Sequence, residues 1–64
     1  MQEYTVHFRK GTRVGARRYR FEHVVAGNAA DAEYEAKLLF RDRSFRVCRV
    51  DHFEGNSLVI DWES

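Results

Sequence analysis

The side chains of this chain that are suited to catalysis or metal binding are few and scattered. The three histidines, His7, His23 and His52, have no spacing typical of a metal site. The single cysteine, Cys48, lies in a predicted strand, and we expect it to point inward as a small core residue rather than act as a nucleophile. These residues therefore predict no metal ion and no covalent catalysis.

Acid–base chemistry has equally weak support. Asp51 and Asp61 approach each other if residues 45–53 and 57–63 form a hairpin, but one carboxylate pair without a deep cleft is not sufficient. Gly27 alone precedes Asn28, so no glycine-rich phosphate loop opens the predicted helix. The sequence therefore predicts a non-enzymatic protein without a cofactor.

The most distinctive feature of the sequence is a cluster of basic side chains. Six cations and no acid fall within residues 9–20, and they are Arg9, Lys10, Arg13, Arg17, Arg18 and Arg20. Guanidinium groups make forked contacts with phosphate, so this segment is interpreted as a phosphate-binding patch, with His7 nearby on the open face of a sheet. The alternative is a solvated hairpin whose arginines prevent edge pairing. No aromatic residue is predicted on the same face, so base stacking is not indicated.

The chain is organised around a predicted helix that starts after Asn28. Asn28 and Asp31 suit the first turn, where side-chain oxygens accept from free backbone donors. Helical periodicity places one apolar side toward the sheet: Ala29, Ala32, Ala36, Leu39 and Phe40. The small alanines predict a close approach of the helix to the sheet at its first turns. Glu33 and Lys37, four residues apart, form a favourable pair.

Two strands precede the helix. Residues 3–9 alternate, with Tyr4, Val6 and Phe8 on one face. The glycine-containing segment at residues 10–16 predicts a hairpin loop. Residues 17–25 alternate again, and we expect the face that carries Tyr19, Phe21 and Val25 to lie opposite the arginines.

Two more strands follow it. In residues 45–53 we favour Cys48 and Val50 inward, because the other face would bury Arg49 and Asp51; a bulge that keeps Phe45 and Val47 inside as well is the alternative. In residues 57–63 we expect a face with Leu58, Ile60 and Trp62. A three-residue loop at 54–56 gives the cleaner core, whereas a two-residue turn at 55–56 aligns Asp51 with Ile60.

These elements predict an α+β fold with order ββαββ. A right-handed crossover returns the third strand beside the first, which gives a four-stranded antiparallel sheet of order 2-1-3-4 with the helix on one face. The other face stays open, because one helix cannot cover both sides of four strands. We expect function on that face.

Size and composition bound the remaining possibilities. The 64 residues predict a single compact domain, 1–64, with a net charge of +1 and a small core, so we expect a monomer or a weak homodimer. One cysteine excludes an internal disulfide, and no apolar run is long enough for a membrane span, so we expect a cytoplasmic protein without membrane contact. On the helix, Tyr34 and Leu38 predict an exposed apolar pair available to a partner.

The segment VVAGNAADAEYEAKLLF followed by FRVCRVDHFEGNSLVIDW resembles small phage-encoded proteins with a strand-strand-helix-strand-strand order, some of which are anti-CRISPR inhibitors. The resemblance covers about residues 24–62. It implies a phage or mobile-element protein that docks on a CRISPR ribonucleoprotein and blocks nucleic-acid engagement without catalysis. From the residues themselves, we expect a protein or ribonucleoprotein partner bound through the basic hairpin with Tyr34 and Leu38. Direct nucleic-acid binding through the hairpin is the alternative.

Overall fold

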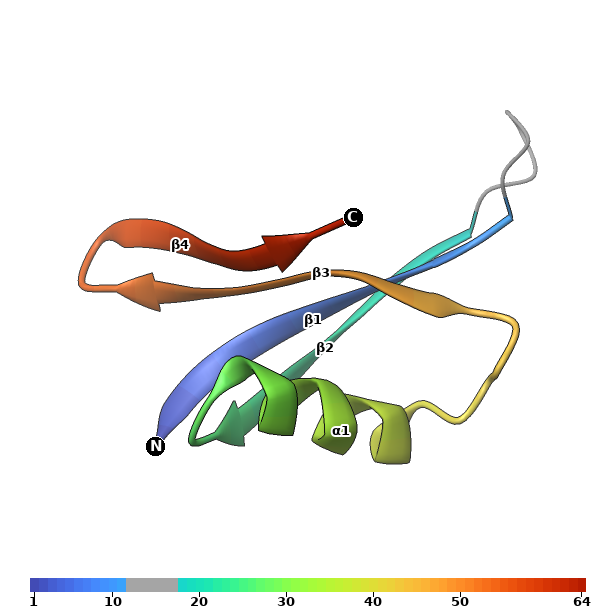
Figure 1. Cartoon of the computed structure of the whole chain (residues 1–64), viewed down its shortest axis with the longest axis horizontal. Helices are drawn as coiled ribbons and strands as arrows, with labels where there is room; N and C mark the ends of the chain where they lie inside the picture. The colour runs from blue at the N-terminus through green and yellow to red at the C-terminus, as the bar shows by residue number, and fades with distance from the viewer. Residues whose placement is uncertain (12–17) are drawn as a thin grey trace.

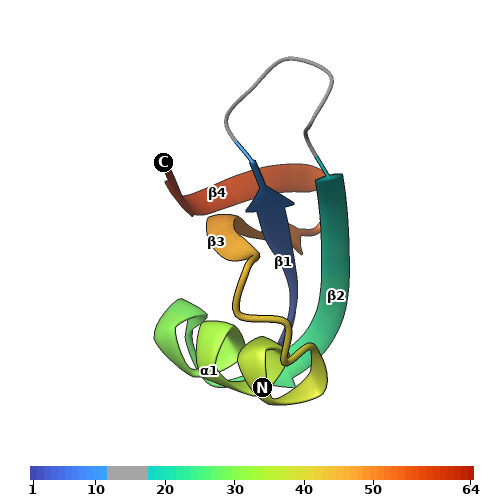
Figure 2. The same ribbon diagram turned by 90° about the vertical axis from the view of Figure 1, so that its right-hand side faces the viewer.

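A computed structural model describes residues 1–11 and 18–64 of the chain. These residues form five elements in the predicted order: β1 (Gln2–Lys10), β2 (Arg18–Ala26), α1 (Ala29–Leu39), β3 (Arg46–Glu54) and β4 (Ser57–Glu63). The strands form an antiparallel sheet of order β2-β1-β3-β4, with α1 against one face (Figures 1 and 2). The predicted fold class and strand order are confirmed. Arg13, Arg17 and most of the predicted hairpin loop lie outside the described residues.

The core is a thin layer between the sheet and α1. Tyr4, Val6 and Phe8 alternate along β1 and are buried, as their period-two spacing predicts. They pack with Val50 of β3 and with small side chains at the contact between sheet and helix, namely Val24 and Ala26 of β2 and Ala32 and Ala36 of α1. No helix in the described ranges is long and apolar enough to cross a membrane.

The start of α1 follows the sequence prediction, but its end does not. Asn28 Oδ1 accepts from the backbone N–H of Asp31 at 2.9 Å, which satisfies one of the free donors of the first turn. Lys37 Nζ donates to Glu33 at 3.2 Å. The prediction that Leu39 faces the core is wrong, since its side chain is 65% exposed. The helix ends there, and the next residue, Phe40, fills the space instead by packing edge-on against Phe8 with ring centroids 5.2 Å apart.

Adding bulk at Ala36 should destabilise the fold. Ala36 is fully buried, so Ala36→Leu should lower the free energy of unfolding by about 1–3 kcal/mol through overpacking. Chemical denaturation measures the change. Glu35→Leu adds the same side chain on the exposed side of α1 and serves as the control, with an expected change within about 0.5 kcal/mol. An equal effect of both variants would contradict close packing of α1 on the sheet.

The two faces predicted for β2 are observed, but the side that carries Arg18 and Arg20, expected on the open face with His7, is the one turned to α1. Val24 lies opposite Tyr4 in the register and is buried, which turns Tyr19 and Phe21 to the face away from α1. The physical reason is the alanine side of the helix. Because Ala32 and Ala36 approach the sheet closely, only small side chains fit beneath them, and aromatic rings do not.

A bulge in β3 resolves the predicted ambiguity of that strand. His7 lies opposite Arg49 and Phe8 lies opposite Val47, so Cys48 is the extra residue between them. Val50 is fully buried, as predicted, while Val47 and Phe45 pack against the core, which confirms the bulged alternative. The inward position predicted for Cys48 is wrong: it is half-buried outside the core cluster and lines a hollow on the far face with His7 and Tyr19.

The β3–β4 hairpin also differs from the favoured prediction. Glu54 pairs with Ser57, so the loop is the two-residue turn at Gly55 and Asn56. Gly55 has a φ of 62°, a left-handed conformation that glycine adopts without a side-chain clash. The turn aligns Asp51 with Ile60 on the face away from α1.

A second bulge then changes the faces along β4. Val50 pairs with Trp62 and Asp51 pairs with Ile60, so Asp61 is the extra residue. The common face predicted for Leu58, Ile60 and Trp62 is therefore wrong. Leu58 and Ile60 face away from the helix, while Trp62 lies on the helix side with the buried Val50.

The bulged Asp61 holds a histidine of β3. His52 Nδ1 lies 2.7 Å from Asp61 Oδ2, and His52 Nε2 lies 3.2 Å from Glu54 Oε1. A ring that donates to two carboxylates is protonated at both nitrogens. The hydrogen bonds to Asp61 and then to Glu54 raise the pKa of His52 above its ordinary value of 6.5.

This arrangement makes the stability depend on pH. Because the pKa of His52 is raised on folding, its stabilising contribution is complete below about pH 6.5 and is lost as the pH rises through the raised value. Urea denaturation should therefore show a larger free energy of unfolding at about pH 6 than at about pH 8.5. Asp61→Asn should flatten this dependence. If the free energy of unfolding of Asp61→Asn depends on pH as that of the wild type does, His52 is not the cause of the dependence.

Candidate functional site

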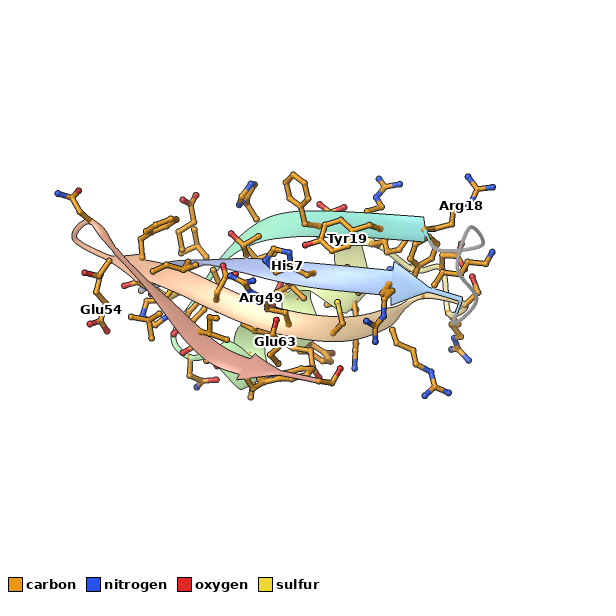
Figure 3. All side chains as sticks on the ribbon, turned by 90° about the horizontal axis from the view of Figure 1, so that it is seen from above. His7, Arg18, Tyr19, Arg49, Glu54 and Glu63 are labelled. Atoms are coloured by element: carbon orange, nitrogen blue, oxygen red, sulfur yellow. The ribbon has the colours of Figure 1, made fainter. Side chains whose placement is uncertain are left out.

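The face of the sheet away from α1, called the open face below, carries a mixed surface. Its side chains alternate with the core residues and come from all four strands, namely Thr5, His7, Arg9, Tyr19, Phe21, His23, Val25, Arg49, Asp51, Phe53, Leu58, Ile60 and Glu63. Figure 3 views this face and shows His7, Tyr19 and Arg49 near its centre, with Arg18 and Glu54 at opposite ends.

The centre of the open face is a hydrogen-bonded network around Asp51. Asp51 is only 4% exposed and accepts from Arg49 Nε at 2.7 Å and from His7 Nε2 at 2.9 Å. Because Asp51 as a carboxylate only accepts, His7 carries its proton on Nε2, and its Nδ1 accepts from the Tyr19 hydroxyl. Partial burial, followed by the neighbouring Cys48, raises the pKa of Tyr19, so the phenol stays protonated. The network fixes side chains of β1, β2 and β3 in one arrangement.

The predicted carboxylate pair does not form. Asp51 belongs to the open face, whereas Asp61 binds His52 on the helix side of the sheet. Within residues 1–11 and 18–64, no cluster of three or more histidine, cysteine, aspartate or glutamate side chains is arranged to hold a metal ion. The open face is therefore best described as a surface with a rigid polar centre.

One end of the sheet concentrates positive charge. Arg9 of β1 lies directly opposite Arg46 of β3, and Lys10 of β1 lies directly opposite Arg18 of β2. Like charges at directly opposite positions destabilise a sheet. In the described part of the chain, none of these four side chains forms an ion pair with an acid. The sheet therefore holds cations from three strands at one end, called the basic end below.

Aromatic rings lie beside these cations, contrary to the sequence prediction. Tyr19 is the register partner of Arg9, and Tyr19 and Phe21 are 61% and 52% exposed. The rings of His7, Tyr19 and Phe21 lie together, with centroid separations of 5.7 Å for His7–Tyr19 and 6.5 Å for Tyr19–Phe21. The sequence contained a signal for this arrangement, since Val24 and Ala26 match the small residues of the helix better than aromatic rings do.

The other end of the open face is apolar. Phe53, Leu58 and Ile60 of β3 and β4 are exposed there, and Phe53 and Leu58 are register partners, while Val25 is exposed on β2, opposite Glu3 of β1. Exposed apolar side chains that lie together on a small domain are typical of a protein contact surface. The sequence analysis did not place Leu58 and Ile60 on this face, because it favoured a three-residue loop over the two-residue turn that aligns them with Phe53 and Asp51.

The remaining predicted contact residues divide between the two sides of the sheet. The guanidinium of Arg20 lies 4.5 Å from the ring centre of Phe40, and Lys10 Nζ lies 5.8 Å from that of Phe45. Tyr34 and Leu38 are exposed on α1, as predicted. They therefore do not form one continuous surface with Arg9, which lies on the opposite side of the sheet.

Comparisons with known proteins return no match: no family model, no curated protein and no solved structure is similar to this chain.

Proposed function

We propose that this chain is a small non-enzymatic binding protein that docks on a nucleoprotein complex through the open face and the basic end, and thereby blocks nucleic-acid engagement. The observation that carries the proposal is the placement of Arg9 opposite Arg46 and of Lys10 opposite Arg18. Each such pair costs stability, at roughly 0.2–1 kcal/mol, and none of the four cations forms an ion pair with an acid in residues 1–11 and 18–64. An anionic partner supplies the missing compensation.

The chemistry of these cations favours phosphate. Arg9, Arg18 and Arg46 present planar forks that match phosphate oxygens, and Tyr19 beside Arg9 provides a ring on which an unpaired base stacks. The polar network at Asp51 holds Tyr19 in place through His7, so little order is lost on binding.

The apolar end supports a partner that contains protein as well. A bare nucleic-acid strand gains little from Phe53, Leu58 and Ile60, whereas a protein surface buries them. A nucleoprotein complex presents phosphates and an apolar protein surface side by side. The CRISPR effector complexes that the sequence resemblance implies are complexes of this kind, and a phage or mobile-element inhibitor is the corresponding role.

Direct binding of single-stranded nucleic acid is the second candidate, and one observation favours it. Tyr19 and Phe21 lie on the same face as Arg9, which is the combination of stacking rings and cations that single-strand binders use.

A salt series separates the two candidates. The probes are a labelled single-stranded RNA and a purified type I CRISPR effector complex. Four phosphate contacts on a bare single strand give a log–log salt slope of about −3. We expect tighter and less salt-dependent binding to the effector complex, because apolar contacts do not depend on counterion release. Binding to RNA alone with the steep slope would favour the second candidate, and binding to neither probe would reject both.

A further inference from the structure

A groove on the helix side of the sheet is separate from the open face. It has a volume of about 840 Å³ and lies between the C-terminal half of α1, the 40–45 segment and β4. It exists because α1 contacts β2, β1 and β3, so the helix side of β4 has no helix over it in the described ranges (Figure 1). Trp62 of β4 forms the far wall of the groove.

The groove is apolar inside. Phe8 and Val47 lie at its base, Phe40 and Phe45 at its side, and Leu38 at its rim. Phe40 and Phe45 pack edge to face, with ring centroids 4.9 Å apart. An interior of this kind takes an aliphatic or aromatic side chain.

The two phenylalanine rings at the side of the groove are already engaged. Arg20 lies over the ring of Phe40 and Lys10 over that of Phe45, and the two rings also contact each other. Little surface of these two rings is left on which a nucleobase could stack. The side chains of Phe8 and Val47 at the base also offer no hydrogen-bonding groups to recognise base edges.

The rim of the groove is basic. Its cations are Lys37, Arg41, Arg43 and Arg46, and its acids are Glu33 and Asp42. Both acids already accept hydrogen bonds from side chains of the same chain. Glu33 accepts from Lys37, and hydrogen bonds from the side chain and backbone of Ser44 lower the pKa of Asp42.

Two rim arginines, Arg41 and Arg43, therefore remain for a ligand of the groove alone, because Arg46 also belongs to the basic end. Within residues 1–11 and 18–64, no ion pair involves Arg41, Arg43 or Arg46. Their positions on the loop after α1 and at the start of β3 place them along one side of the apolar interior. The complementary ligand carries negative charge next to a large apolar group.

We infer that this groove binds an acidic peptide segment of a partner protein. An apolar side chain of the segment enters between Trp62 and Phe45, and carboxylates next to it pair with Arg41 and Arg43. The inference goes beyond the proposed function, because it gives the protein a second contact surface on the opposite side of the sheet.

The test begins with selection of peptides from a random phage-displayed library on the immobilised protein. We expect enriched sequences that combine aspartate or glutamate with leucine, phenylalanine or tryptophan. The dominant peptide is then synthesised and titrated, with the emission of Trp62, the single tryptophan, as the readout. Binding should change this emission, and glutamine in place of the peptide acids should weaken binding by about tenfold or more.

Charge-reversed variants locate the binding site. Arg41→Glu with Arg43→Glu should weaken peptide binding by about tenfold or more, whereas Arg9→Glu with Arg18→Glu, which reverses two charges at the basic end, should leave it unchanged. If the first variant does not fold, Leu38→Ser at the rim replaces it with the same expected direction. Enrichment of peptides without acids, or equal affinity of the groove variant and wild type, would overturn the inference. Loss of RNA binding but not peptide binding in the groove variant would also overturn it. The basic-end variant, Arg9→Glu with Arg18→Glu, separately tests the proposed function.

Discussion

Arg9→Glu combined with Arg18→Glu should lower the affinity for the nucleoprotein partner by about 100-fold while making the fold more stable. The loss follows because two cations that face phosphate become acids that repel it, a change worth several kcal/mol of binding at close charge pairs, of which about 2.7 kcal/mol corresponds to 100-fold. The gain in stability follows because Arg9 lies opposite Arg46 and Arg18 opposite Lys10. Two repulsive pairs become attractive, at roughly 0.2–1 kcal/mol each.

Binding assays and chemical denaturation of the same variant measure the predicted change in affinity and the predicted change in stability. Arg41→Glu with Arg43→Glu makes the same change of charge on the opposite side of the molecule and should leave nucleoprotein affinity near the wild-type value. If Arg9→Glu with Arg18→Glu binds the nucleoprotein as the wild type does, the basic end only keeps the sheet edge soluble. A variant that is weaker in both binding and stability would show that the cations hold the fold together.

Asp51→Ala should lower the free energy of unfolding by about 2–3 kcal/mol and the melting temperature by about 10–20 °C. Asp51 is 4% exposed, and its removal leaves the guanidinium of Arg49 and the imidazole of His7 without their shared acceptor. The expected loss is smaller than for a fully buried pair, because the Arg49 side chain is 27% exposed and water reaches it.

A matched removal of a surface acid provides the control. Glu63 lies 3.9 Å from the same arginine but is 55% exposed at its side chain, so Glu63→Gln should change stability by less than about 0.5 kcal/mol. Similar losses for the two variants would mean that the Asp51 network contributes no more than an ordinary surface ion pair.

Local patterns predicted much of the fold. The alternation of Tyr4, Val6 and Phe8 and the cap at Asn28 depend only on neighbouring residues, and both are observed. The strand order followed from the handedness of the crossover and is also observed. The face of β2 was not predicted correctly, because it depends on which side chains fit beneath Ala32 and Ala36, and the helix and that strand are separate in sequence.

The candidate site was less predictable for a related reason. The run of arginines was visible, but its division between the two sides of the sheet depends on register, and a one-residue change of register exchanges the faces. Arg20 contacts Phe40 on the helix side, while Arg9 shares the open face with Tyr19. The groove depends on the two bulges, which no single residue type indicates, and the apolar end depends on the two-residue turn at Gly55 and Asn56.

The two bulges also bear on how the length of this chain could change in evolution. Removal of Cys48 would leave Val47 and Arg49 on the faces that they now occupy, and removal of Asp61 would do the same for Ile60 and Trp62, because each bulge adds one residue to an otherwise regular ladder. Loss of a residue at most other strand positions would exchange the two faces beyond it. We therefore expect single-residue gaps among relatives of this protein to fall at these two places, where a shorter chain keeps both binding surfaces.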